Sequence, residues 1–293
     1  MNNCRPRKTV VVETARVFTK NGRHGNQLGV VTDAAGLSDA QMQKIAKKLG
    51  FSETSFVFPP GIAKADYIVR FFTPAQEIPF AGHPTLGTLF VLEKSGLVAK
   101  KGAYVQQIGK RKIPLKRLPD GRITMSQGVP SFGKKIGRET SAKLLSLRES
   151  DVAGDGEVVS TGLPHLIIPL SSKTALKKAR ISAKIHDQVR KTHHMDAVMP
   201  FFADDATVLC RNFCPALGVV EDPATGSGCG PLACLINRRW ALSDTDGTME
   251  LEILQGYGHL SQLFTWVSTK GGRITNVDVG GYCSPGKQIQ LKI

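Results

Sequence analysis

The sequence has no cysteine between positions 5 and 209 and no apolar run long enough to cross a membrane. A disulfide framework for the whole chain is therefore excluded, and the spacings 210/214 and 229/234 lack the paired C-x-x-C pattern of a zinc site. A membrane helix needs about 20 consecutive apolar residues. The start of the chain is too polar for a secretory signal, because the apolar run Val10 to Val12 ends at Glu13. We expect a cytosolic protein whose thiols are mostly reduced and buried.

Acidic residues are scarce relative to basic ones. The 39 lysines and arginines exceed the 24 acids and give a net charge of +15. Residues 94–117 hold eight cations and no acid, and residues 173–191 hold Asp187 as their only acid. Such surfaces attract anions, but neither stretch matches a recognition helix or a stacking platform for nucleic acid. We expect solvated faces and loop tips here, with nucleic-acid binding as the less favoured alternative.

The composition favours a folded chain with two modest domains or one large one. Apolar residues make up 41% of the 293 residues and charged residues 22%, which disfavours disorder. We place a boundary near Gly128, between an N-terminal lobe of residues 1–127 and a C-terminal lobe of residues 128–293. This division allows the last strand of the chain to belong to the N-terminal lobe instead.

Local patterns predict short strands around two buried helices. Ser38 and Gln41 form a capping box before a helix over 39–49, and Gly50 suits its C-terminal end. Residues 86–92 and 232–236 are apolar almost all round, so each predicts a helix inside a core. Strands are expected over residues 10–18, 28–32, 54–58, 66–73, 158–161, 166–170, 197–202, 207–212, 248–253, 263–268 and 288–292.

An internal repeat links the two halves of the chain. Residues 70–75 (RFFTPA) align with 211–216 (RNFCPA) at a lag of 141, and 83–88 (HPTLGT) align with 222–227 (DPATGS) at a lag of 139. An apolar helix follows in both copies. The repeat predicts an α+β fold with two similar lobes, each a curved mixed sheet around a central helix, whose helix N-termini face one cleft.

The starts of these two helices are candidate anion sites. A helix N-terminus leaves backbone N–H groups unpaired and carries partial positive charge, so it suits a carboxylate or phosphate. Gly82, Gly87, Gly226 and Gly228 would let a ligand approach the backbone. The alternative is that these glycines only allow tight turns between strand and helix.

His83 and Asp222 occupy matching positions in the two copies. Each is a candidate for proton transfer or for orienting a substrate, since imidazole titrates near neutrality and a carboxylate can fix its tautomer; the alternative is helix capping. Ser227 adds a hydroxyl, but no G-x-S-x-G elbow surrounds it. Glu53 is a further catalytic candidate and lies between the expected helix and the next expected strand. The alternative is that it is an exposed loop carboxylate without a catalytic role.

Seven segments together resemble the PhzF family of phenazine biosynthesis. In chain order they are 18–26 (FTKNGRHGN), 37–39 (LSD), 52–57 (SETSFV), 72–75 (FTPA), 78–88 (IPFAGHPTLGT), 160–164 (STGLP) and 221–228 (EDPATGSG). The resemblance implies a diaminopimelate epimerase-like fold, and a homodimer that needs no metal or organic cofactor. It also implies an isomerase that moves a proton on a small carboxylate, either cyclic or amino-acid-like. In the namesake reaction the substrate is a dihydro-hydroxyanthranilate.

The resemblance also assigns roles to residues. It makes Glu53 the general acid/base, places His83, Asp222 and Ser227 at the other active-site positions, and gives substrate contacts to Gly82, Gly226, Gly228 and Asn26. The chain departs from the family pattern at residues 23–27, at Cys229 and at residues 255–262 (QGYGHLSQ), so the namesake substrate does not follow. A catalytically silent protein that binds small anions on the same fold is the alternative function.

Overall fold

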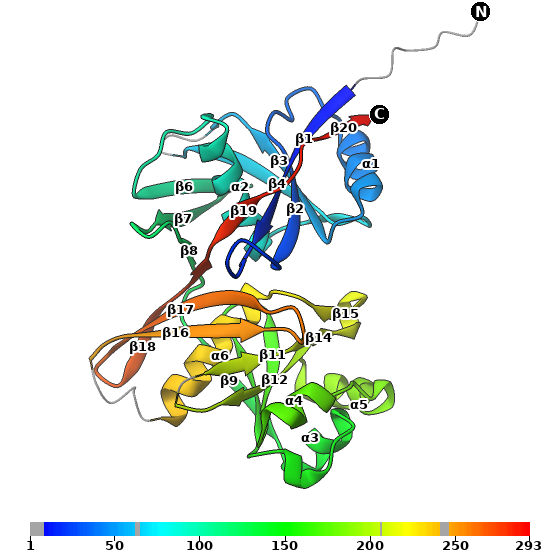
Figure 1. Cartoon of the computed structure of the whole chain (residues 1–293), viewed down its shortest axis with the longest axis vertical. Helices are drawn as coiled ribbons and strands as arrows, with labels where there is room; N and C mark the ends of the chain where they lie inside the picture. Colours follow the sequence, from blue (N-terminus) through cyan, green and yellow to red (C-terminus); the bar gives the residue numbers. More distant parts are fainter. Residues whose placement is uncertain (1–8, 62–64, 206, 241–245) are drawn as a thin grey trace, which may run out of the picture. The chain divides into compact units, whose positions relative to one another are not determined.

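The computed structural model describes residues 9–61, 65–205, 207–240 and 246–293. The chain forms two compact units, drawn in Figure 1. Unit 1 runs to Met125 and resumes at Tyr282, and unit 2 runs from Ser126 to Gly281. The division lies two residues before the expected boundary, and the last residues of the chain belong to unit 1.

Over its described residues, unit 1 is a mixed sheet with two α-helices. Its strands are β1 (Thr9–Val17), β2 (Asn26–Val31), β3 (Glu53–Phe58), β4 (Tyr67–Phe72), β5 (Glu77–Ile78), β6 (Ala103–Ile108), β7 (Arg111–Arg117), β8 (Ile123–Ser126), β19 (Cys283–Pro285) and β20 (Ile289–Lys292). Helix α1 (Asp39–Leu49) has the predicted bounds, with both bonds of the capping box and a left-handed Gly50 at its end. It covers an apolar cluster that includes Ile45 and Phe56.

Helix α2 (Gly82–Lys94) is the central helix of unit 1 and begins four residues before the expected apolar run. Ten of its residues are buried, because it packs against β1, β2 and β3. A Cβ on Gly87 would lie 2.6 Å from Leu28 Cδ2 and 2.7 Å from Val17 Cγ2. The absent side chain therefore lets α2 approach the sheet, and this glycine serves packing.

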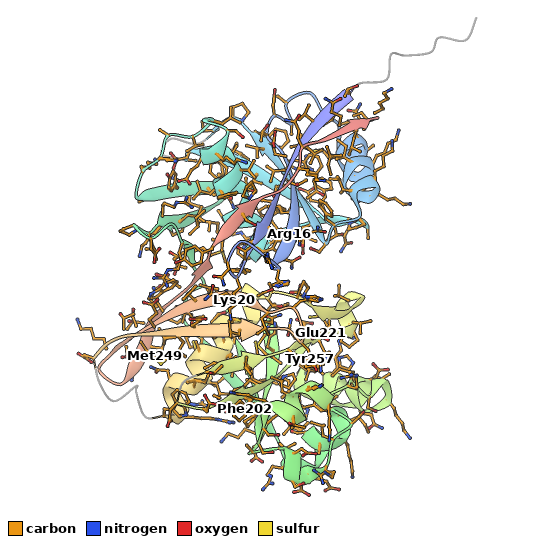
Figure 2. All side chains as sticks on the ribbon, in the orientation of Figure 1. Arg16, Lys20, Phe202, Glu221, Met249 and Tyr257 are labelled. Carbon is orange, nitrogen blue, oxygen red and sulfur yellow. The ribbon has the colours of Figure 1, made fainter. Side chains whose placement is uncertain are left out.

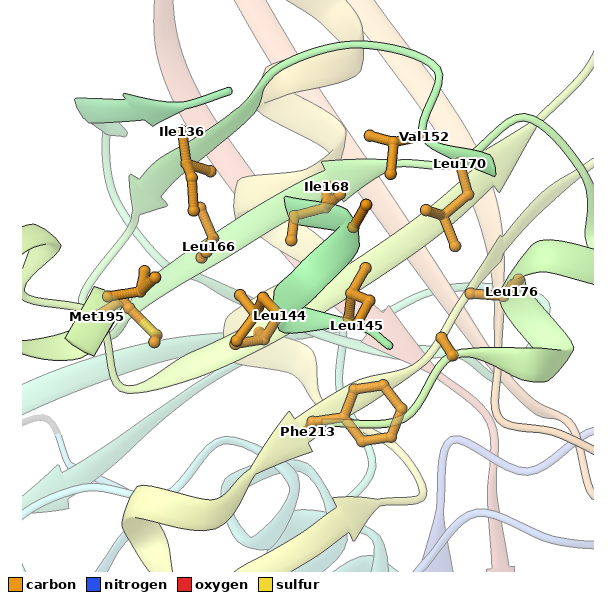
Figure 3. Close-up of a cluster of buried hydrophobic side chains, with 14 of the residues drawn as sticks. Ile136, Leu144, Leu145, Val152, Leu166, Ile168, Leu170, Leu176, Met195 and Phe213 are labelled. Carbon is orange, nitrogen blue, oxygen red and sulfur yellow. The ribbon is translucent and has the colours of Figure 1, made fainter. Parts of the chain in front are cut away.

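In the residues that the structure describes, unit 2 is a second mixed sheet with four α-helices. Its strands are β9 (Ser131–Ile136), β10 (Gly156–Ser160), β11 (Pro164–Pro169), β12 (Ala197–Ala203), β13 (Val208–Cys210), β14 (Asn212–Cys214), β15 (Val219–Asp222), β16 (Gly247–Gln255), β17 (Ser261–Lys270) and β18 (Arg273–Gly281). Helices α3 (Arg138–Leu144), α4 (Lys173–Lys178) and α5 (Ala183–His193) enclose the apolar cluster of Figure 3, which joins Leu144 at the end of α3 and its C-cap residue Leu145 to side chains of β11.

Helix α6 (Gly226–Arg239) is the central helix of unit 2. It packs against β10, β11, β17 and β18, and it is buried over its first twelve residues except at Ser227. As in α2, the lack of a polar face in the sequence is explained by burial on every side.

The two units share one topology, which confirms the predicted duplication. From β1 to β8, neighbouring strands pair in the order antiparallel, parallel, antiparallel, with a parallel β4–β6 pair and two antiparallel pairs after it. From β10 to β18 the same order recurs, with β13–β14 in the place of β4 and β13–β16 as the later parallel pair. The short strands β5 and β15 pair alike and lead into α2 and α6.

The repeated arginines make the same contact in both units. Arg70 Nε and Nη2 donate to the Glu77 carboxylate at 2.7 and 2.6 Å, and Arg211 Nε and Nη2 donate to Glu221 at 2.8 and 2.6 Å. Glu221 is labelled on its hairpin in Figure 2. Each guanidinium also lies over the phenylalanine two residues later, at 5.3 and 4.7 Å from the ring centroid. The duplicated fork fastens the short hairpin that precedes each central helix.

Several elements were not predicted. Most of the first basic stretch, from Ala103 to Arg117, forms the β6–β7 hairpin, whose turn contains Gly109 with a φ of 55°. The second basic stretch forms α4 and α5, and the strand expected over 207–212 is divided at Arg211.

No helix in the described ranges has the length and apolar character that a membrane crossing requires.

Candidate active site

Glu53 is the first residue of β3, at the edge where two parallel strands begin. It lies opposite Leu28 of β2 in the register, three residues after the left-handed Gly50 that ends α1. Asn26, the buried first residue of β2, accepts a hydrogen bond from Ser52 Oγ at 3.4 Å. The structure therefore brings two of the expected site residues, Asn26 and Glu53, to one sheet edge.

His83 meets Glu53 at this edge. It is the second residue of α2, with 7% of its side chain exposed, and its Nε2 lies 3.5 Å from Glu53 Oε2. This separation exceeds ordinary hydrogen-bond length, and neither atom has another hydrogen-bond partner among the described residues. Ala81 is the N-cap of α2, so the capping alternative for His83 is wrong. A buried imidazole and a partly exposed carboxyl group thus face each other through two buried atoms with unused hydrogen-bonding capacity.

The strand and the helix that carry this pair are held together one turn further along. Thr88 Oγ1 of α2 donates to Ser55 Oγ of β3 at 2.8 Å, and both side chains are fully buried. Ser55 and Glu53 lie on the same face of β3, because side chains alternate along a strand. This contact and the close approach at Gly87 fix the distance between Glu53 and His83.

In unit 2, Asp222 is the last residue of β15 and lies beside the start of α6. The N-cap of α6 is Thr225, so the capping alternative is also wrong for Asp222. Thr225 Oγ1 instead donates a hydrogen bond to Asp222 Oδ2. Gly226 and the half-buried Ser227 form the first turn of α6. The structure therefore groups three expected site residues around one helix start.

A buried amide that sequence reasoning did not select completes this group. Gln255, fully buried at the end of β16, donates from Nε2 to the Asp222 carbonyl at 2.7 Å and to Thr225 Oγ1 at 2.9 Å. Its Oε1 accepts from the Thr225 N–H at 2.9 Å. The only signal in the sequence was that Gln255 opens the segment over 255–262 that departs from the family pattern.

The glycines differ in the space around them. A Cβ on Gly82 would have Met125 Cε at 4.0 Å, an ordinary contact, so packing does not require a glycine at the start of α2. At Gly228 a Cβ would collide with Met199 and His165, and the Gly228 N–H donates to the Thr225 carbonyl at 3.1 Å. Packing accounts for Gly228, and its substrate contact stays a prediction.

Two thiols, those of Cys214 and Cys229, lie near the Asp222 group and stay protonated. Burial raises the pKa of Cys214 to about 12, with a further contribution from Asp222, and burial with the neighbouring Cys210 raises the pKa of Cys229 well above its usual range. A thiol can act as a base only as the thiolate. These cysteines therefore do not serve as bases at neutral pH.

Named relatives cover both units. The chain is 34% identical over 276 residues to a trans-2,3-dihydro-3-hydroxyanthranilate isomerase of Pseudomonas chlororaphis. The aligned region covers 90% of this chain and 92% of that protein. It is 35% identical over 243 residues to an uncharacterized isomerase of Clostridium acetobutylicum, with 78% and 79% covered.

Solved structures match the fold. A phenazine biosynthesis protein of the PhzF family from Bacillus anthracis superposes with a TM-score of 0.88 at 27% identity, covering 98% of this chain and 100% of that one. A probable proline racemase from Agrobacterium radiobacter shares the fold alone, with a TM-score of 0.62 at 11% identity over 97% and 93% of the chains. The family model described as phenazine biosynthesis-like protein matches residues 15–284. The chain therefore belongs to the PhzF family, has its diaminopimelate epimerase-like fold, and is an isomerase.

Proposed function

We propose that this isomerase moves a proton on a small carboxylate without an organic cofactor, with Glu53 as the general acid/base. The observation that carries the proposal is the buried pair of Glu53 Oε2 and His83 Nε2, 3.5 Å apart and without other hydrogen-bond partners among the described residues. A proton acceptor must keep a lone pair available for its substrate. Glu53 Oε2 meets this requirement, and the chain belongs to a family of isomerases.

In the proposed step, Glu53 takes a proton from a substrate carbon beside an unsaturated or carbonyl group. The C–H electron pair moves into that group, and the protonated Glu53 then returns the proton to a different carbon. His83 adjoins the carboxyl oxygen and can donate to it while it is charged. Since the proton is only relocated, the reaction needs no oxidant or second substrate.

We assign substrate binding to Asp222, to Ser227 and to the backbone at Gly82, Gly226 and Gly228. Asn26 is assigned a substrate contact at the sheet edge that also carries Glu53. Helix N–H groups are suited to a carboxylate and to charge that develops on oxygen. The P. chlororaphis relative is named for a cyclic amino-acid-like carboxylate, which supports the same chemical class here. A cytosolic homodimer is part of this proposal.

The test is exchange of substrate hydrogen with solvent. The full-length protein is incubated in D₂O with a panel of cyclic and amino-acid-like carboxylates, and deuterium incorporation is measured by mass spectrometry. Glu53→Gln should slow exchange by about 10²–10⁴-fold, the usual contribution of a general base. Glu139→Gln is the matched control, because this carboxylate lies on the surface and pairs with Lys143.

Retention of the parent exchange rate by folded Glu53→Gln would reject Glu53 as the base. Stoichiometric binding of a panel member, with no exchange in the parent protein, would instead favour the silent anion-binding alternative.

A further inference from the structure

We propose that Thr225 is a positioning residue that holds Asp222 as an ionised hydrogen-bond acceptor, because buried amides direct the Thr225 hydroxyl proton toward it. The proposal rests on the proposed function for the role of Asp222 in the reaction. Thr225 itself is buried, and nothing in its position requires it to touch substrate.

The first observation is that Thr225 does not cap its own helix. Threonine at the N-cap usually accepts a hydrogen bond from the second or third residue of the helix. Thr225 has the extended backbone of an N-cap residue, yet its side chain makes no such bond. Losing a cap of this kind typically destabilises a helix. The Thr225 hydroxyl gives up this bond and is used in another contact.

The second observation is that the orientation of the Gln255 amide is fixed. Its Oε1 accepts from the Thr225 N–H, and its Nε2 donates to the Asp222 carbonyl. Exchanging the oxygen and nitrogen would set donor against donor and acceptor against acceptor. The Gln255 NH₂ group is therefore the one that points at Thr225 Oγ1, at 2.9 Å.

A second donor reaches the same hydroxyl oxygen. Asn212 Nδ2, from the fully buried residue that opens β14, lies 2.9 Å from Thr225 Oγ1. A hydroxyl has two lone pairs and one proton. With both lone pairs accepting from amides, the proton is left to donate, and Asp222 Oδ2 receives it. A proton on Oδ2 would set two hydrogens against each other, and a hydrogen bond donated to a carboxylate favours its charged form.

Two of the ionisable groups near Asp222 are buried thiols. Cys214 and Cys229 bear on its charge, and their raised pKa values keep both thiols neutral. Glu221, the preceding residue, is bound by the Arg211 fork. The hydroxyl proton is thus a nearby donor whose loss should be felt directly by the Asp222 carboxylate.

The experiment is a carboxyl titration of the full-length protein. Aspartate labelled with ¹³C at the carboxyl carbon is incorporated, and the Asp222 resonance is assigned by its loss in Asp222→Asn. Thr225→Val removes the hydroxyl with little change of shape, and should raise the titration midpoint of Asp222 by about one pH unit, as expected for a lost hydrogen bond to a charged group. Thr225→Ser retains the hydroxyl and should keep the parent midpoint.

Equal midpoints in the parent and Thr225→Val would overturn the proposal. If Thr225→Val does not fold, the parent decides: the Thr225 hydroxyl proton should be resolved by NMR and protected from solvent exchange. A proton that exchanges as fast as that of an exposed threonine would also overturn it.

The exchange assay separates this inference from the proposed function. If the parent exchanges substrate hydrogen, Thr225→Val should lower kcat and move the acid limb of the pH–rate profile upward, with recovery in Thr225→Ser. If no substrate exchanges, the proposed function fails, and the titration still tests the role of Thr225.

Discussion

The duplicated arginine fork predicts two unequal losses of stability from one kind of substitution. Arg211 and Glu221 have exposed side-chain fractions of 6% and 28%, whereas Arg70 has 28% and its partners Glu77 and Asp39 have 44% and 79%. Breaking a buried ion pair from one side costs about 3–5 kcal/mol, and an exposed pair contributes about 0–1 kcal/mol. Burial therefore decides the difference between two pairs of similar geometry.

We compare Arg211→Met with Arg70→Met. Arg211 also donates from Nη1 to the carbonyls of Leu176 and Ala179, near the end of α4, at 3.1 and 2.9 Å. Because Glu221 keeps some solvent contact, we expect the lower end of the buried range for Arg211→Met, about 3 kcal/mol. For Arg70→Met we expect about 1 kcal/mol.

The assay is native-state hydrogen exchange on the full-length chain, read by mass spectrometry of peptides from each unit. The slowest amides report the largest openings, so those of β12 should exchange about 100-fold faster in Arg211→Met, and those of β3 about fivefold faster in Arg70→Met. An equal or larger effect of Arg70→Met would refute the argument that burial sets the cost.

Two further predictions concern packing and pH. Gly87→Ala should lower the melting temperature by several degrees, because the new methyl group collides with Leu28 and Val17 and overpacking costs about 1–3 kcal/mol; Gly82→Ala, in the same helix without a collision, should leave it near the parent value, and the reverse order would contradict the packing at Gly87. Burial lowers the pKa of His165 from 6.5 to about 4, so the unfolded chain binds the proton first and the free energy of unfolding should fall as the pH drops from about 6.5 toward 4. Urea titrations at several pH values give the free energy of unfolding as a function of pH, and this free energy should fall less steeply toward low pH in His165→Gln than in the parent. An equal pH dependence in the two proteins would show that His165 is not its cause.

Local signals were sufficient wherever a short segment determined its own structure. Helix α1 was predicted with its exact bounds because Ser38, Gln41 and Gly50 terminate it by side-chain and backbone geometry. The apolar runs predicted α2 and α6 but not their first turns, because glycines there carry no hydrophobic signal. The repeat predicted the shared topology, since it marks matching turns in both units.

What the sequence could not supply depends on contacts between distant segments. The β6–β7 hairpin was hidden by its many lysines, which obscure the alternation of a strand. The pairing of Glu53 with His83 joins residues 30 positions apart. Gln255 contacts Thr225 from another strand, and no local pattern marks a glutamine as buried. The family resemblance selected the side chains at the site but not those that orient them.

The return of the chain to unit 1 has a consequence for biosynthesis. Strand β20 pairs with β1 in the register Thr9 to Lys292, and β19 pairs with the same strand further along. Unit 2 is contiguous and can fold while the ribosome is still adding residues. The sheet of unit 1 must wait for its closing strands, so the half that carries Glu53 and His83 is completed last.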